Sequence, residues 1–257
     1  MTDRRQRQKE LRAARRQEER RAASRKEFRR RITIALSIGL GLAALLLLIT
    51  FLTNRPAALP TAYLAFREQP TACDAETPPE IQPLSFEGPG DEAVGAAPLT
   101  AVIDTSCGNI EIELDSAGYP QTVNSFVFLA RQGFYEGTVF HRIAPDFVIQ
   151  GGDPSANGTG GPGYIVPDEF PPEGFVYEPG VVAMANAGAR STGSQFFIVV
   201  GEDARVLNNA FSILGRVVGG QQTLDAITAV PTSVSPGSSE RSRPNETVYV
   251  ESIEIGQ

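Results

Sequence analysis

Residues 140–154, FHRIAPDFVIQGGDP, decide the class of fold that the sequence predicts. Side chains two positions apart on a strand project from the same face of a sheet. Phe140 and Arg142 on one short strand, and Val148 and Gln150 on the next, can therefore point to one side. The stretch predicts a β-rich fold in which an arginine, a glutamine and apolar groups surround one small apolar ligand.

The second informative block is residues 181–199, VVAMANAGARSTGSQFFIV. Together, and in this order, the two blocks resemble the two signatures of the cyclophilin-type peptidyl-prolyl cis-trans isomerases. The resemblance covers residues 99–257 and implies a mainly β fold, a closed eight-stranded antiparallel barrel capped by two α-helices. It also implies an enzyme, of the membrane-anchored bacterial form, that speeds rotation about the bond before proline with no cofactor, metal or covalent intermediate.

The local patterns favour the same architecture. Short β-rich runs at residues 99–104 and 109–115 flank Cys107-Gly108-Asn109 and predict an opening hairpin. Helices are predicted at residues 120–133, which begin with proline and end with glycine, and at residues 221–229. Eight strands and two well-separated helices suit a closed barrel. The remaining strands are predicted at residues 138–143, 147–150, 181–185, 195–200, 213–218 and 247–255, and a loop at 231–244.

Arg142 is the candidate catalytic residue. Twisting a prolyl peptide bond destroys its amide resonance and localises the lone pair on nitrogen. A guanidinium is always charged and presents several donors in a rigid fork, so it can donate to that lone pair in the twisted state. By resemblance, the other substrate-binding residues are the apolar pocket (Phe147, Val148, Phe197, Leu207 and Phe211), a carbonyl-holding Gln150 with Gln195 near it, and the backbone of Ala185, Asn186 and Ala187.

Each of these assignments has a plainer alternative. Arg142 could lie on a solvated face, and Phe147, Phe197 and Leu207 could be ordinary core residues, because an apolar side chain does not reveal which side of a barrel it faces. His141, the only histidine, neighbours Arg142 and has no second ligand at metal-site spacing, so we interpret it as structural. Residues 158–163, GTGGPG, match the dinucleotide fingerprint but neither follow a strand nor open a helix, and are interpreted as a flexible rim.

The net charge of −7 hides a sharp division along the chain. Residues 1–31 carry 14 Lys+Arg and 5 Asp+Glu, whereas the rest carries 9 and 25. Residues 32–52, ITIALSIGLGLAALLLLITFL, are uncharged and long enough to span a bilayer as one transmembrane helix. A cleaved signal peptide, the alternative, would have a shorter apolar region and a small-residue cleavage site. Because the arginines precede this run, we expect a single-pass protein of the cell membrane with a cytoplasmic N-terminus and an extracytoplasmic catalytic domain.

The segments beside the predicted anchor have simpler roles. The basic tail, residues 1–31, contains one aromatic residue and lacks a base-stacking pattern, so we expect an orientation signal and no nucleic-acid partner. Residues 53–98 contain eight prolines and no sustained period, which predicts an extended linker. The only cysteines, Cys73 and Cys107, both follow the anchor. A disulfide between them is a hypothesis, and two unpaired thiols are the alternative.

Three positions differ from the best-known eukaryotic members of the family. Val148 stands where they have methionine, Phe211 where they have a pocket histidine, and Arg205 or Val206 where they have a tryptophan. The missing indole N–H donor predicts weak cyclosporin binding. The expected clients are proline-containing polypeptides that are exported or unfolded. The alternatives are a tethered chaperone or proline-segment binder with little turnover, and an anchored structural protein whose basic tail recruits a partner.

Overall fold

The computed structural model describes residues 42, 44–46, 58–92 and 99–256. The chain divides into two compact units, Met1–Ala57 and Ala58–Gln257. Residues 42 and 44–46 are helical and exposed, and the rest of the predicted anchor at 32–52, with the basic tail at 1–31, lies outside the described residues. Within the described ranges, no helix is both long enough and apolar enough to cross a membrane.

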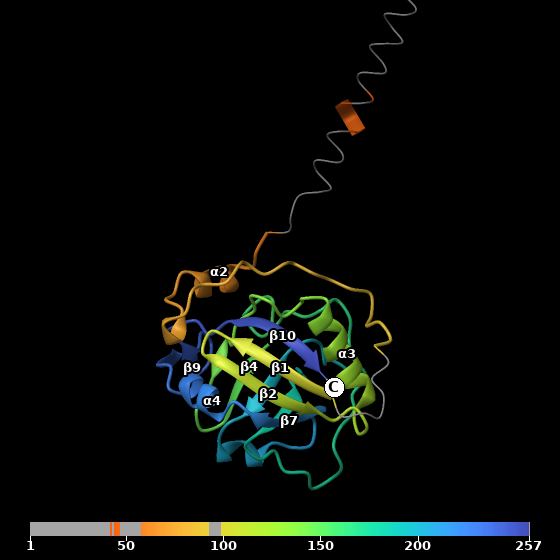
Figure 1. Ribbon diagram of the computed structural model, residues 1–257, viewed down its shortest axis with the longest axis vertical. Helices are drawn as coiled ribbons and strands as arrows, with labels where there is room; N and C mark the ends of the chain where they lie inside the picture. Colours follow the sequence, from red (N-terminus) through yellow and green to blue (C-terminus); the bar gives the residue numbers. More distant parts are fainter. Residues whose placement is uncertain (1–41, 43, 47–57, 93–98, 257) are drawn as a thin grey trace, which may run out of the picture. The chain divides into compact units, whose positions relative to one another are not determined.

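The second unit is built on an eight-stranded sheet whose neighbouring strands are all antiparallel (Figure 1). The strands follow the order β10-β1-β2-β7-β5-β6-β4-β3 across the sheet. Each lies where the sequence predicts a strand, with shifted ends. Their bounds are β1 Leu99–Thr105, β2 Gly108–Leu114, β3 Arg142–Ile143, β4 Val148–Gly151, β5 Val181–Met184, β6 Phe196–Val199, β7 Ile213–Gly219 and β10 Val250–Gly256.

The predicted closed barrel is not confirmed, because β10 and β3 form two edges of the curled sheet. Val139 lies between these edges and pairs through isolated bridges with both Asp153 and Tyr249. The N–H of Phe140 donates to the carbonyl of Val248 at 2.9 Å. The predicted strand 138–143 is therefore shortened to Arg142–Ile143. Val139 keeps the register of the β3–β4 pair only through its isolated bridge with Asp153, while the chain around it also bonds to the C-terminal strand region.

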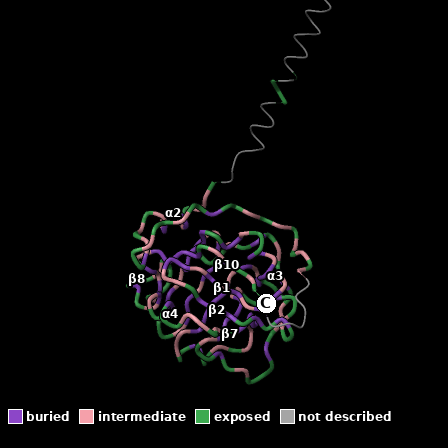
Figure 2. The backbone as a smooth tube through the Cα atoms, viewed as in Figure 1, coloured by how far each residue is buried: buried purple, intermediate pink, exposed green. Residues whose placement is uncertain are grey.

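The main core lies between the sheet and helix α3, Pro120–Arg131. Strands β1 and β2 alternate buried with less buried residues and are joined by a two-residue turn, one position earlier than the sequence predicts. Figure 2 shows these buried residues inside the unit. The carboxylate of Glu169 accepts the N–H groups of Gln121 and Thr122 at 3.1 and 2.7 Å, which caps the start of α3. As predicted, the apolar face of α3 is buried: Val123, Phe126, Val127 and Ala130.

We call residues 58–92 the strap. The prediction of an extended linker at 53–98 is corrected for these residues, because they belong to the second unit and pack on the rest of it. The strap contains helix α2, Thr61–Arg67, and the short helix η1, Ala72–Asp74. Tyr63, Phe66 and Ile81 are buried in one apolar cluster with Val139 and Tyr249. In Figure 1 the strap runs from α2 towards α3, where the N–H of Glu92 donates to Asn124 at 2.9 Å.

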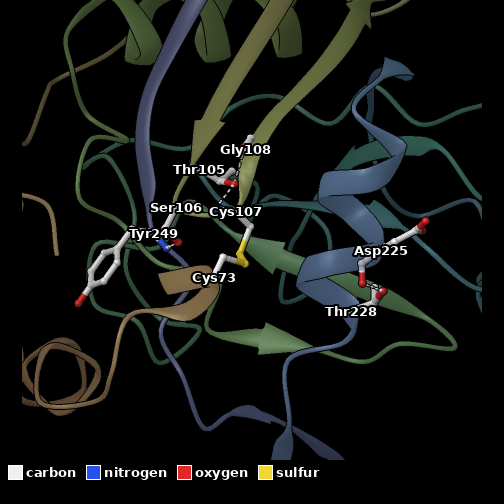
Figure 3. Close-up of a disulfide and its surroundings, with 8 residues drawn as sticks. All are labelled: Cys73, Thr105, Ser106, Cys107, Gly108, Asp225, Thr228 and Tyr249. Atoms are coloured by element: carbon white, nitrogen blue, oxygen red, sulfur yellow. Dashed lines mark hydrogen bonds between the residues drawn. A yellow bond between two sulfur atoms is a disulfide. The ribbon is translucent and has the colours of Figure 1, made fainter. Parts of the chain in front are cut away.

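Cys73 and Cys107 form a disulfide in the structure, the pairing that the sequence left as a hypothesis (Figure 3). Their Cα atoms lie 5.2 Å apart, and the bond joins η1 of the strap to the turn between β1 and β2. The turn is held by Thr105, whose hydroxyl donates to the carbonyl of Gly108 at 2.6 Å and accepts the N–H of Cys107 at 3.1 Å. The disulfide therefore fastens the strap to an ordered hairpin.

The predicted loop at residues 231–244 is also corrected. It contains strands β8, Thr232–Val234, and β9, Arg241–Pro244, which form a two-stranded antiparallel sheet of their own. The second predicted helix precedes this hairpin as α4, Gln221–Thr228. The hairpin packs against β3 through β9. The serines and arginines that suggested a loop occur here in a ribbon with no fully buried apolar face.

Candidate functional site

A row of paired residues crosses three neighbouring strands of the sheet. Arg142 on β3 lies opposite Gln150 on β4, and Gln150 lies opposite Phe197 on β6. Directly opposed residues of an antiparallel pair project from the same face. The structure therefore brings these three predicted site residues together on one face. Phe140, in contrast, lies in the main core beside Phe196, with ring centroids 6.0 Å apart. Regular strand pairing is interrupted at residues 140 and 141, between the bridge of Val139 and the start of β3.

Arg142 is held on several sides. Its guanidinium carbon lies 5.1 Å from the ring centroid of Phe147. Its Nε and Nη2 donate to the two carboxylate oxygens of Glu240 at 2.8 and 2.7 Å, and its Nη1 donates to Gln150 at 3.4 Å. The side chain keeps 29% of its surface exposed, so the donor remains accessible from solvent. Such a group can donate to a ligand that lies over Phe147.

The ion pair changes the titration of Glu240. The hydrogen bonds from Arg142 lower the pKa of the Glu240 carboxyl below its usual value, against the opposing effect of partial burial. The hydroxyl of Ser242 donates to the same carboxylate at 2.7 Å and also lowers this pKa. The carboxylate is therefore ionised and bonded to Arg142 at neutral pH.

An apolar cluster lies beside the arginine. Val148 and Phe197 are buried in it, and Phe147, Leu207 and Phe211 pack against it partly exposed. The rings of Phe197 and Phe211 meet edge to face with centroids 5.4 Å apart. All five predicted apolar pocket residues therefore belong to one cluster, and three of them keep a surface that a small apolar ligand can contact.

Tyr177, which sequence reasoning missed, fixes the position of Phe211. Its hydroxyl donates to the carbonyl of Phe211 at 2.8 Å and accepts the N–H of the same residue at 3.1 Å. Burial raises the pKa of the Tyr177 phenol to about 12, so it is a neutral donor at physiological pH. No local pattern marks Tyr177, because it lies outside every helix and strand.

A cavity of about 630 Å³ continues the site on the other side of Gln150. Gln150 donates from Nε2 to Oε1 of Gln195 at 3.0 Å, and Gln195 donates from Nε2 to the carbonyl of Gly160 at 2.9 Å. These amides connect the arginine to the glycine-rich rim. The other predicted residues on this cavity are Ala185, Asn186 and Ala187.

The backbone near Asn186 is also ordered by side-chain bonds. Asn186 donates from Nδ2 to the carbonyl of Ala210 at 2.8 Å, and its Oδ1 accepts the N–H of Gly188 at 3.1 Å. The N–H of Ala187 donates to Ser191 at 2.8 Å. These hydrogen bonds fix the backbone of this segment where it lines the cavity.

His141 plays no part in the row. Its pKa is lowered by burial, while Asp153 acts in the opposite direction. Its Nδ1 finds no hydrogen-bond partner in the structure. Among the residues that the structure describes, no group of three or more His, Cys, Asp or Glu side chains is placed to hold a metal ion.

Glu240 is the other residue that sequence reasoning missed. It lies just before β9, in the segment predicted as a loop. Only the pairing of β8 with β9 and the packing of β9 on β3 bring it to an arginine 98 positions away. No signal in the local sequence predicts such a contact.

Comparisons with known proteins identify the family to which the chain belongs. Residues 100–255 match the family model described as cyclophilin type peptidyl-prolyl cis-trans isomerase/CLD. Peptidyl-prolyl cis-trans isomerase B of Streptomyces anulatus is 42% identical over 62% of this chain and 98% of its own length. Peptidyl-prolyl cis-trans isomerase A of Mycobacterium tuberculosis is 41% identical over 62% of this chain and 93% of its own.

The fold comparison gives the same result. The crystal structure of a cyclophilin type peptidyl-prolyl cis-trans isomerase of Cryptosporidium parvum aligns with a TM-score of 0.56 at 29% identity, covering 63% of this chain and 99% of the other. A second structure of that protein, solved in the presence of the dipeptide Ala-Pro, aligns with a TM-score of 0.55. With the family model matching more than half of its residues, the chain belongs to the cyclophilin-type peptidyl-prolyl cis-trans isomerases.

Proposed function

We propose that this isomerase acts on X-Pro bonds of exported or unfolded polypeptides, with Arg142 as the catalytic donor. The observation that carries the proposal is the position of Arg142 between Phe147 and Gln150, beside an apolar cluster with exposed ring surface. Exported chains need such an enzyme because roughly 10 to 30% of X-Pro bonds are cis in unfolded peptides and exchange over tens to hundreds of seconds.

The chemistry asks for selective stabilisation of the twisted amide. In that state the prolyl nitrogen is pyramidal and carries a localised lone pair, which neither planar isomer has. A guanidinium N–H aimed at this lone pair binds the twisted state more strongly than the ground states, and this difference lowers the barrier. The proline ring would lie on Phe147, Phe197 and Leu207. No bond is formed or broken, so the reaction needs no nucleophile.

Arg142 alone does not supply a large acceleration. A rate gain of about 10⁵-fold corresponds to about 7 kcal/mol. One charge-assisted hydrogen bond contributes about 1.5 to 3 kcal/mol. The difference is assigned to the groove: the apolar cluster removes water from the amide, and Gln150 with the backbone near Asn186 holds the chain on both sides of the bond.

The cellular setting is part of the proposal. Residues 32–52 would anchor the enzyme in the cell membrane as a single helix, with residues 1–31 in the cytoplasm and the folded unit outside. The disulfide between Cys73 and Cys107 supports an oxidising location for that unit. Cyclosporin would bind weakly, since Arg205 or Val206 stands in place of the tryptophan of eukaryotic relatives and the indole N–H donor is absent.

The test is an isomerisation assay on an Ala-Pro-Phe peptide with the full-length chain in detergent micelles. Arg142→Ala is expected to lower kcat/KM by at least tenfold, because a charge-assisted bond to the twisted amide is lost. Arg142→Lys keeps the charge without the fork and should recover only part of the rate. Equal rates in parent and Arg142→Ala would sink the arginine mechanism. Tight peptide binding without acceleration would favour the tethered binder instead.

A further inference from the structure

Glu240 contacts Arg142 from a hairpin that is separate from the main sheet. Residues 235–240 connect β8 to β9, and the N–H of Ser235 donates to the carbonyl of Glu240 at 3.0 Å across this connection. The N–H of Glu240 donates to the hydroxyl of Ser238 at 3.0 Å. Both backbone groups of Glu240 are therefore engaged within its own hairpin, which fixes the starting point of the side chain.

Both carboxylate oxygens of Glu240 are also engaged. One accepts from Nη2 of Arg142 at 2.7 Å, and the other accepts from Nε at 2.8 Å and from the Ser242 hydroxyl at 2.7 Å. Ser242 is buried and its hydroxyl also bonds to that of Ser235 at 2.9 Å. The hydroxyl of Ser242 therefore fixes the carboxylate to the hairpin, while the carboxylate accepts two hydrogen bonds from Arg142.

This grip leaves one edge of the guanidinium for the groove. A guanidinium has five N–H donors in one plane. Glu240 takes the Nε hydrogen and one on Nη2, so the Nη1 donors and the second Nη2 hydrogen lie on the remaining edge. Nη1 points to Gln150 at a long 3.4 Å, and the plane contacts Phe147. A substrate amide over Phe147 meets this edge.

We propose that Glu240 is a positioning residue, which holds the guanidinium of Arg142 with its Nη1 edge towards the substrate groove. The inference rests on the proposed catalytic role of Arg142. A free arginine side chain samples many rotamers, and a displacement of about 1 Å at a reacting group can cost about 10²-fold in rate. The ion pair is partly exposed, with 29% and 38% of the two side chains accessible, so it adds little to stability. The main effect of the ion pair is to fix the orientation of the Arg142 guanidinium.

The pair also makes positioning depend on pH. Arg142, Asp146, Asp203 and Arg241 are the charged groups around Glu240, the last three lining the same hollow as Glu240. Because the bonds from Arg142 lower the pKa of the Glu240 carboxyl, the carboxylate stays ionised at acidities that protonate an ordinary glutamate, and the ion pair is lost only as the pH falls through the lowered pKa. Turnover should fall over the same range.

The experiment compares Glu240→Ala and Glu240→Gln with the parent, in the full-length chain, by NMR exchange spectroscopy of an Ala-Pro peptide. This readout needs no coupling protease and works in acid. Glu240→Ala is expected to lower kcat by about 10- to 100-fold with KM little changed, and Glu240→Gln, which keeps one acceptor, should fall less. As the pH falls through the lowered pKa of Glu240, the parent should lose turnover while Glu240→Gln should not. The Arg142 Nε–H resonance should shift in both variants.

Asp203→Asn is the matched control, because it removes a carboxylate from the same hollow. It should keep the parent's kcat, and an equal fall would assign the effect to the charge of the hollow and overturn the proposal. Parent-like kcat in Glu240→Ala would reduce Glu240 to a structural role, and a higher kcat would make it an inhibitory clamp. Arg142→Ala, measured alongside, distinguishes failure of the Glu240 proposal from failure of the arginine mechanism. If the kcat of Arg142→Ala matches that of the parent, the arginine mechanism itself fails.

Discussion

Reduction of the bond between Cys73 and Cys107 is expected to lower the free energy of unfolding of the second unit by about 4 kcal/mol. In the loop-entropy model the stabilisation grows with the logarithm of the closed loop, and a separation of 34 residues gives an entropy of about 13 cal/mol/K, or about 4 kcal/mol at 25 °C. For a unit of this size, each kcal/mol moves the thermal midpoint by about 2 to 4 °C. The expected decrease is therefore about 8 to 16 °C.

The structure suggests where this loss appears. Tyr63, Phe66 and Ile81 hold the strap on the unit through buried contacts that do not involve sulfur. The strap should therefore stay in place after reduction, and the native state should keep its activity. Reduction increases the conformational entropy of the unfolded chain. It should therefore lower the temperature of the main cooperative unfolding transition and should not create a second transition at lower temperature.

The assay is circular-dichroism melting of the full-length chain, oxidised and reduced, beside a Cys73→Ser/Cys107→Ser double variant. The double variant should melt like the reduced parent and should not respond to reductant. Alkylation and mass spectrometry count the free thiols in each sample. Two labelled thiols without reductant would contradict the disulfide itself. An intact bond whose reduction leaves the midpoint unchanged would refute the loop-entropy reasoning.

Three further predictions follow from the site and the strap. Val206 is 86% exposed and should accept tryptophan. Val206→Trp should tighten cyclosporin binding by about tenfold through a new N–H donor. Isothermal titration calorimetry measures the affinity, and nanomolar binding by the parent would contradict the prediction. Tyr177→Phe removes both bonds to Phe211 and should cost about 1 to 3 kcal/mol in urea unfolding. Since the folded pKa of Tyr177 is raised to about 12, the parent should lose more stability than the variant between about pH 10 and 12, and parallel profiles would argue against a buried phenol. Residues 99–257 alone, without the strap, should have a lower melting temperature than residues 58–257. Each buried strap side chain contributes about 1.5 to 3 kcal/mol to the free energy of unfolding. Equal melting temperatures would show that the strap is not part of the cooperative unit.

The parts that were predictable from the sequence are those with a local period. Strands β1 and β2 alternate along their whole length, and α3 carries its apolar residues on one face after an initial proline. The site row was predicted because the two signature blocks resemble a known family. Arg142, Gln150 and Phe197 then lie opposite one another, as the alternation of paired strands requires.

The parts that were not predictable depend on contacts between distant residues. The strap has many prolines and no period, yet Tyr63 and Phe66 are buried in one cluster with Val139 and Tyr249. Phe140 was predicted on the site face, but its side chain lies in the main core, where the strand pairing is interrupted and its backbone bonds to Val248. Glu240 meets Arg142 only because a serine- and arginine-rich segment pairs with itself. Local sequence patterns do not predict such long-range pairing.

The hairpin of β8 and β9 has a consequence for engineering. It shares no ladder with the eight-stranded sheet, so an exchanged hairpin would leave every strand pairing of that sheet intact. Residues 231–244 are therefore a graft position, where sequences from other isomerases can be inserted as a cassette. A library of such cassettes would vary the partner of Arg142 without replacing any strand of the eight-stranded sheet.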